Sequence, residues 1–355
     1  MNKVHARGLR LALFSIVFLL ILAGCGGANS SSGNGTSGNP FTVNLGYFPN
    51  LTHAVALVGV GNGTYKKDLG SGVSLQTKTF NAGPAEIQAL VAGSIDIAFV
   101  GPSPAINGYT SSHNTALKVI AGAASAGVEF VVQANAKINS AADLAGKKIA
   151  DPQKGGTQDV ALRYYLSQNN LKSSDNGGSV QIISTDNASI LTLFKTGKID
   201  GAWVPEPWAT RLVVEGKGRV FLNENTLWPG GQFATTIVVV RQAFYNAHPD
   251  IVKNFLQAEV ETVQYIKSNA TEAEQIANQQ IQKITGSPTK ADELPVAFQD
   301  LQVTYDPLAS TISQQAERSY SLGFVKSKPD LANFYNLGPL NAVLSSKGLA
   351  AVATS

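Results

Sequence analysis

Ser103 lies in a segment that comes near a catalytic motif. The segment G-P-S-P-A (101–105) differs by one residue from the G-x-S-x-G turn that presents a nucleophilic serine for acyl transfer. A catalytic serine of that kind occupies a sharp, strained turn, whereas Pro104 pushes the residue before it towards extended backbone. No Asp and His follow Ser103 in a recognisable order. We therefore expect a hydrogen-bonding role for Ser103, and no enzyme.

The sequence offers few residues that could bind a metal ion or take part in redox chemistry. His53, His113 and His248 lack the spacing of metal ligands, and Cys25 is the only cysteine in 355 residues. A single cysteine excludes an internal disulfide and a cysteine-based metal site. We expect no metal and no cofactor.

The sequence around Cys25 fits the attachment of a lipid to its thiol. The residues L-A-G before it are small or apolar, as in the lipobox that lipoprotein signal peptidase cleaves, and the thiol can carry a thioether-linked diacylglycerol. The chain starts with basic residues and an apolar stretch at 11–22 that is too short to cross about 30 Å of hydrocarbon as a helix. These patterns predict a lipoprotein signal peptide at 1–24 and a lipid on Cys25. The chain would reach the membrane through that anchor only, on the extracytoplasmic face (cell surface or periplasm).

The balance of basic and acidic residues bears on the class of partner, and residues 25–40 bear on how the chain is attached. Residues 1–24 hold three of the 27 basic residues and no acidic one, so 24 basic residues remain against 24 acidic ones. A nearly neutral chain without a clustered basic face predicts no nucleic-acid partner. Residues 25–40 are rich in Gly, Ser and Asn, which predicts a flexible tether between the lipid and the folded part.

Apolar strands alternate with helical patterns from residue 41 onwards, which is typical of an α/β fold. Strands are expected at 42–46, 73–79, 95–100, 148–150, 180–184, 199–204 and 237–240. Helices are expected at 54–60, 84–92, 158–168 and 189–196, and further helices after Pro249.

An internal sequence repeat indicates two units of similar construction. Residues 93–100 and 197–204 both have the pattern G-x-I-D-x-A-aromatic-V, at a constant offset of 104 residues. In each copy, a helix stops at a glycine and an Asp opens a buried strand that runs into a Pro-rich turn. Because ligands of α/β sheets bind beyond the carboxyl ends of the strands, both turns become candidate ligand contacts.

Four motifs carry a resemblance to a known family. They are F-P-N-L-T-H-A (48–54), F-N-A-G-P (80–84), F-V-G-P-S-P (99–104) and A-W-V-P-E-P-W (202–208). With them, residues 41–345 resemble the solute-binding proteins of the aliphatic sulfonate/nitrate/taurine group, which serve ATP-binding-cassette (ABC) importers.

This resemblance implies a type II periplasmic-binding-protein fold, in which two α/β lobes joined by two crossover segments close on a ligand. It places the first lobe at 41–125, the second at 126–225, and the rest of the first lobe, with C-terminal helices, at 226–355. It also implies a permease and a separate ATPase as partners. The chain itself lacks the G-x-x-x-x-G-K-[ST] phosphate loop needed to power transport.

The family's ligand is often a small oxyanion headgroup, which helix N-termini can hold through free N–H groups and the helix dipole. Four turns could supply such groups, and we expect Ser103 and Thr157 to face each other across the ligand. Either hydroxyl could instead merely cap its helix. The candidate ligand-binding residues in these turns are Asn50, Thr52, His53, Gly101, Ser103, Gln153, Gly156, Thr157, Gln158, Glu206 and Trp208.

Two tryptophans and a carboxylate add to this set. Trp203 and Trp208 could form an apolar wall for the ligand, or could pack in the core. Glu206 is unfavourable beside an anion unless a basic side chain or a ligand amine pairs with it. The candidate basic side chains are Lys154, Arg163 and Arg211.

Two segments, 121–128 and 221–235, are expected to cross between the lobes and to place Ser125 and Thr235 on the floor of the cleft.

The main prediction is a receptor that delivers a sulfonate-like anion or zwitterion to an ABC importer. Nitrate or a heteroaromatic vitamin precursor are alternative ligands. A ligand-sensing receptor, or an enzyme on the same fold, are alternative functions.

Overall fold

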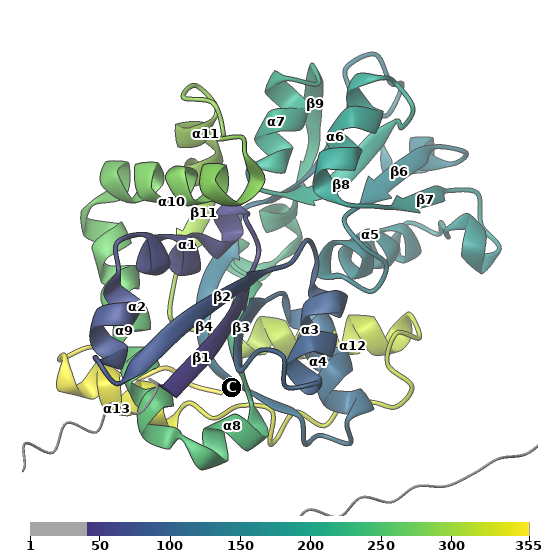
Figure 1. The fold of residues 1–355 in the computed structure, drawn as a ribbon. Helices are drawn as coiled ribbons and strands as arrows, with labels where there is room; N and C mark the ends of the chain where they lie inside the picture. The colour runs from purple at the N-terminus through teal and green to yellow at the C-terminus, as the bar shows by residue number, and fades with distance from the viewer. Residues whose placement is uncertain (1–40, 355) are drawn as a thin grey trace, which may run out of the picture. The chain divides into compact units, whose positions relative to one another are not determined.

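The strands form two separate sheets in the computed structural model, which describes residues 41–354 (Figure 1). The signal peptide predicted at 1–24, the lipidation of Cys25 and the tether at 25–40 lie outside the described residues. Within 41–354, no helix is long and apolar enough to cross a membrane.

The first sheet has six strands in the order β11-β4-β10-β3-β1-β2. β1 runs parallel to β2 and β3, whereas β10 runs antiparallel to β3 and β4. Its strands are β1 (Phe41–Tyr47), β2 (Val73–Thr79), β3 (Ile97–Val100), β4 (Leu117–Ala126), β10 (Ala234–Arg241) and β11 (Leu301–Val303).

The second sheet has five strands in the order β7-β6-β8-β5-β9. It repeats the scheme of the first, because β6 is parallel to β7 and β8, and β5 is antiparallel to β8 and β9. Its strands are β5 (Val128–Gln133), β6 (Lys148–Asp151), β7 (Gln181–Ser184), β8 (Gly201–Pro205) and β9 (Gly218–Asn223).

The chain passes between the sheets twice. β4 leads directly into β5 through Ala126 and Gly127, with φ angles of 66° and 69°, and the return from β9 to β10 runs through residues 224–233. The prediction of two α/β lobes joined by two crossover segments is therefore confirmed. We call the elements around the two sheets the first lobe and the second lobe.

Helices cover both faces of each sheet, so each lobe has a core on either side of its sheet. The first lobe contains α1 (Ala54–Gly61), α2 (Thr64–Leu69), α3 (Gly83–Val91), α4 (Pro102–Ser111), α8 (Gln242–Ala247), α9 (Pro249–Ser268), α10 (Ala270–Thr285), α11 (Leu294–Gln299), α12 (Ala309–Ser321) and α13 (Gly338–Ser346). The second contains α5 (Thr157–Gln168), α6 (Asn187–Lys195) and α7 (Trp208–Val214). Five short 3-10 helices, η1 (Leu51–His53), η2 (Ala141–Leu144), η3 (Ser174–Asn176), η4 (Glu224–Leu227) and η5 (Pro229–Gly231), complete the described elements.

Asp96 and Asp200, the repeated Asp residues of the internal sequence repeat, accept equivalent hydrogen bonds in the two lobes. Asp96 accepts a hydrogen bond from the backbone N–H of Asn44 at 3.0 Å, and Asp200 accepts one from that of Lys148 at 2.8 Å. Each carboxylate thus fixes the start of one strand against its parallel neighbour. These two Asp residues position the strands whose carboxyl ends lead to the site.

Candidate functional site

A small cavity of about 30 Å³ lies where the two lobes meet, at the carboxyl ends of their parallel strands. This volume has room for two or three water molecules, or for a compact headgroup of similar size. Among the described residues, no Asp, Glu, Lys or Arg lines the cavity. The lining residues are Phe48, Asn50, Thr52, His53, Asn81, Ala82, Gly83, Gly101, Pro104, Pro152, Gln153, Gly156, Thr157, Gln158, Asn187, Pro205, Thr235 and Thr236.

Four helices begin at the cavity wall. α3 and α4 of the first lobe start after Ala82 and Gly101, and α5 of the second lobe starts after Gly156. None of these three N-cap residues caps its helix with a side chain, so the first-turn N–H groups that exist stay available. Pro84 in α3, and Pro102 and Pro104 in α4, have no N–H, so these two helices offer fewer donors than α5. α6 also starts there, with Asp186 capping the N–H of Ser189. The positive ends of four helix dipoles therefore meet at one uncharged cavity, an arrangement that favours an anion.

The turn before α5 is held in shape by its own helix. Asp159 accepts a 2.7 Å hydrogen bond from the N–H of Gly155 and pairs with Arg163 at 2.5 Å. Gly155 has a φ of 78°, a left-handed conformation that glycine adopts without strain. Asp159 thereby leads the chain from Gly155 into α5, so that Gly156 and Thr157 lie at the cavity.

Several buried polar atoms of the cavity wall have no hydrogen-bond partner within residues 41–354. They are Thr157 Oγ1, Gln153 Oε1, Asn187 Oδ1 and Thr236 Oγ1. Ser103 Oγ, in the first turn of α4, is also unpartnered and buried, although Ser103 does not line the cavity. Since an unpaired buried polar group costs stability, these atoms mark a place where a ligand can complete the hydrogen bonding.

His53 is neutral at physiological pH, because complete burial lowers its pKa to about 3. Its Nδ1 accepts a 3.3 Å hydrogen bond from the N–H of Phe48, and the two rings lie 4.3 Å apart. With Nδ1 used as an acceptor, the proton of the neutral ring is on Nε2. His53 can therefore donate one hydrogen bond without bringing a charge.

Gly101, rather than Ser103, stands opposite Thr157. A methyl group at Gly101 would overlap Thr157 Oγ1, so the lobes are in direct contact across the cavity. The expectation that Ser103 and Thr157 face each other is therefore wrong. The capping alternative is also wrong, because Gly101 and Gly156 are the N-caps and the two hydroxyls lie inside the first turns.

Trp203 and Glu206 point away from the cavity. Trp203 is fully buried in the second lobe, where it stacks on Phe130 at 5.3 Å and donates to Glu224 at 2.7 Å. Glu206, also fully buried, accepts hydrogen bonds from the N–H and hydroxyl of Thr210. None of the basic residues expected beside Glu206 pairs with it. The wall role for Trp203 and the ligand or cation pairing for Glu206 are thus corrected.

Three further candidates have other hydrogen-bond partners, one across the lobes and two beside the crossover segments. Trp208 Nε1 donates to Asn50 Oδ1 across the lobes at 2.9 Å, and its ring does not line the cavity. Ser125 Oγ accepts from the N–H of Phe233 at 3.2 Å, outside the cavity wall. Thr235 lines the cavity, but its hydroxyl donates to the carbonyl of Ala126 at 2.6 Å.

Nine of the fourteen candidate ligand contacts line the cavity. They are Asn50, Thr52, His53, Gly101, Gln153, Gly156, Thr157, Gln158 and Thr235. Sequence reasoning missed the residues at the starts of α3 and α6, of which Asn81 and Asn187 carry polar side chains. Both helices follow a strand and a short turn, and this signal could have identified them.

The chain was compared with known proteins. Residues 37–281 match the model of the NMT1-like family. A protein of Brucella abortus (strain 2308) that is named as a binding protein is 27% identical over 274 residues, which are 74% of this chain and 81% of that protein. The taurine-binding periplasmic protein of Escherichia coli (strain K12) is 27% identical over 209 residues, 59% of this chain and 62% of that protein.

Among solved structures, the alkanesulfonate-binding protein of Xanthomonas axonopodis pv. citri bound to MOPS superposes with a TM-score of 0.69. The match covers 85% of this chain and 100% of that protein at 16% sequence identity. At this identity the likeness concerns the fold alone, and it confirms the predicted periplasmic-binding-protein fold.

Proposed function

The chain belongs to the NMT1-like family, and we propose that it is an extracytoplasmic solute-binding receptor that delivers a sulfonate-like anion or zwitterion to an ABC importer. The observation that carries this proposal is the uncharged cavity between the lobes, with four helix N-termini at its wall. The relatives named above are binding proteins, which supports binding rather than catalysis.

The neutral donors of the wall suit a headgroup with several acceptor oxygens. The first-turn N–H groups of α5, the non-proline N–H groups of the first turns of α3 and α4, the Thr157 hydroxyl and the Nε2–H of His53 can all donate. Hydrogen bonds to a charged group contribute about 1.5–3 kcal/mol each, so a few of them support specific binding without any basic side chain.

Two unpartnered amide oxygens favour a ligand that also has N–H donors. Gln153 Oε1 and Asn187 Oδ1 are buried acceptors that no group of the described chain satisfies. An ammonium group near the sulfonate would donate to them, as in an aminosulfonate. We therefore expect taurine to bind about tenfold more tightly than ethanesulfonate, which corresponds to about 1.4 kcal/mol.

Lipid attachment at Cys25 and the lobe boundaries belong to the same proposal. The anchor would hold the receptor at the membrane beside a permease, whose ATPase is a separate chain. The boundaries near residues 125 and 225 would leave the two lobes free to move about the crossover segments. Genes for a permease and an ATPase beside this gene would support import over sensing.

A thermal-shift screen tests the proposed ligand class. The chain from residue 26 keeps the whole compact unit of residues 40–355 and removes only the predicted signal and lipid site. Taurine, ethanesulfonate, nitrate, sulfate and a heteroaromatic pyrimidine are each added to it. A ligand at 100 times its Kd stabilises by about 2.7 kcal/mol. A shift with taurine or ethanesulfonate is expected; a shift with the pyrimidine alone would contradict the headgroup argument.

A further inference from the structure

An arm of the first lobe, residues 286–300, reaches over to the second lobe. Thr289 is fastened to α10 by two hydrogen bonds with Asn278, at 2.7 and 2.9 Å. The far end of the arm, Asp300, immediately precedes β11, which pairs with β4. The arm therefore belongs firmly to the first lobe at both ends.

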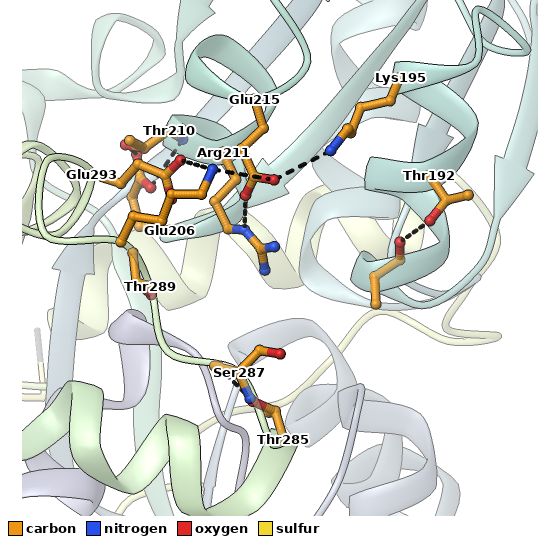
Figure 2. Close-up of polar contacts among 12 residues, drawn as sticks. Thr192, Lys195, Glu206, Thr210, Arg211, Glu215, Thr285, Ser287, Thr289 and Glu293 are labelled. Carbon is orange, nitrogen blue, oxygen red and sulfur yellow. Dashed lines mark hydrogen bonds and ion pairs between the residues drawn. The ribbon is translucent and has the colours of Figure 1, made fainter.

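The middle of the arm contacts α7 of the second lobe. Lys290 lies 3.6 Å from the carboxylate of Glu215, and α11 packs against α7. Figure 2 shows the Glu215 carboxylate also linked to Arg211 and Lys195 of its own lobe. Three basic side chains, Lys195, Arg211 and Lys290, are thus gathered at Glu215. Lys290 also pairs with Glu293 at 3.3 Å.

At the end of the arm, carboxylates from the two lobes come together. Asp300 of the first lobe lies with Glu129 and Glu206 of the second lobe, and one oxygen from each falls within 4.8 Å of the others. Glu129 is 6% exposed and Glu206 is fully buried. The side-chain partners of the two glutamates from other elements are neutral: Asn223 on β9 and Thr210 on α7. Three carboxylates so close, without a cation paired to them, cannot all be ionised cheaply.

We propose that the arm is a proton-linked latch: when the lobes close, Asp300 joins Glu129 and Glu206, and the closed form holds a proton that the open form releases. The cluster lies beside the first crossover, because the N–H of Glu206 donates to the carbonyl of Gly127 at 2.9 Å. Closure and protonation then favour each other. Lowering the pH shifts the lobes towards the closed form, and raising it shifts them towards the open form.

The electrostatics of the cluster agree with this direction. Burial is the largest cause that raises the pKa of Glu129 to about 7 and that of Glu206 to about 8. The next cause is the charge of Asp300 for Glu129 and the charge of Glu129 for Glu206, to which Asp300 adds less. Separating the lobes removes Asp300 and admits water, so the pKa of Glu129 falls towards the ordinary range near 4.3. The pKa of Glu206 falls mainly because water reaches its carboxyl group, since Glu129 stays beside it. Uptake of one proton changes the closing equilibrium by up to about tenfold per pH unit between those limits.

The latch is tested on the chain from residue 26, which contains no cysteine of its own. Spin labels at Ser111→Cys on α4 and Lys172→Cys in the second lobe report the distance between the lobes by pulsed EPR, without any ligand. We expect the short distance to gain population as the pH falls from 8.5 to 6. In Asp300→Asn the short distance should persist at pH 8.5, because one of the repelling charges is gone.

Two variants complete the experiment. Glu129→Gln removes a charge from the other lobe and should flatten the pH response as Asp300→Asn does. Asp292→Asn, an exposed position on the same arm, should keep the response of the unmutated chain. A distance distribution that ignores pH in the unmutated chain, or a full response in both cluster variants, would overturn the latch. The inference rests on lobe closure in the proposed function, but its readout needs no ligand, so the two can fail separately.

Discussion

Thr157 is the residue at which the cavity and the contact between the lobes coincide. It lies in the first turn of α5, its hydroxyl is buried without a partner, and it touches Gly101 of the other lobe. A residue placed for stability would have its hydroxyl satisfied within the fold. We therefore interpret Thr157 as a ligand contact whose unpaired hydroxyl lowers the stability of the ligand-free protein.

Thr157→Val replaces the hydroxyl with a methyl group of similar size. We expect the affinity for taurine to fall by about ten- to a hundredfold, because one hydrogen bond to a charged group is lost. The ligand-free melting temperature should stay the same or rise. Calorimetric titration and thermal unfolding measure the two effects. Thr192→Val, on the exposed face of α6, is the control and should leave affinity unchanged; equal affinities in the Thr157→Val variant and the unmutated chain would refute the assignment.

At the residue scale, the sequence indicated the right turns but not always the right side chain. Gly101 and Ser103 were both selected from one turn, yet only Gly101 lines the cavity. The reason is geometric: residues two positions apart at the start of a helix point in directions about 200° apart, so the N-cap Gly101 can face the cavity while Ser103 does not. Glu206 shows the same limit, since its partner Thr210 lies one turn further along α7.

Among the elements, the helix N-termini supply the binding groups and the segment 205–208 joins the lobes. The N–H of Leu51 donates to the carbonyl of Glu206 at 3.0 Å, and Trp208 donates to Asn50 at 2.9 Å. Arg211 lies over the ring of Trp208 at 4.7 Å and pairs with Glu215. Trp208 is therefore held by its own helix in a position to hydrogen-bond across the closed cleft.

Trp208→Phe keeps an aromatic ring under Arg211 but removes the donor to Asn50. We expect ligand affinity to fall about three- to tenfold, the effect of one neutral hydrogen bond. Asn50→Ala should weaken binding too, and the double variant should be weaker by less than the product of the two effects, because both lose the same bond. A double-mutant cycle on taurine affinity provides the measurement. Fully multiplicative effects would show that this bond does not assist closure.

Sequence patterns predicted most elements that frame the site. The strands and helices that were expected up to residue 204 lie close to their observed bounds, because apolar alternation and Gly or Pro punctuation are local signals. The elements α2, α4, β4 and β5 were not among them. The arm at 286–300 was not anticipated. Its importance comes from Asp300 meeting Glu129, a contact between residues 171 positions apart in the chain. Such a contact depends on how two lobes pack, and no local pattern encodes it.

On the scale of the whole molecule, buried carboxyl groups outnumber buried cationic ones. Burial is the largest cause that raises the pKa of Glu129 and Glu224 to about 7, of Glu206 and Glu259 to about 8, and of Glu86 well above its usual range. Burial shifts the pKa of His53 the other way, to about 3. The folded chain therefore binds more protons than the unfolded chain above pH 5.

This imbalance predicts a stability maximum on the acidic side of neutrality. A carboxyl whose pKa is raised in the folded state makes unfolding easier as the pH rises from the ordinary pKa near 4.3 to the raised pKa, by up to about 1.4 kcal/mol per pH unit for each proton held. His53 acts oppositely and costs stability as the pH falls below its ordinary value of 6.5. Melting temperatures of the ligand-free chain from pH 5 to 9 should therefore be highest at pH 5 and fall as the pH rises to 8. A steady rise from pH 6 to 8 would contradict this balance.

The central claim is that the lobes close on a small anion held between helix N-termini. Calorimetric titration of taurine into the Gly101→Ala variant tests it most directly. The added methyl group meets Thr157 only when the lobes are closed, whereas Gly72→Ala, where a methyl group meets open space, serves as the control. The account predicts that Gly101→Ala weakens taurine binding by about ten- to a hundredfold, since overpacking costs about 1–3 kcal/mol, while Gly72→Ala binds as the unmutated chain does. Undiminished binding by Gly101→Ala would contradict closure at this cavity.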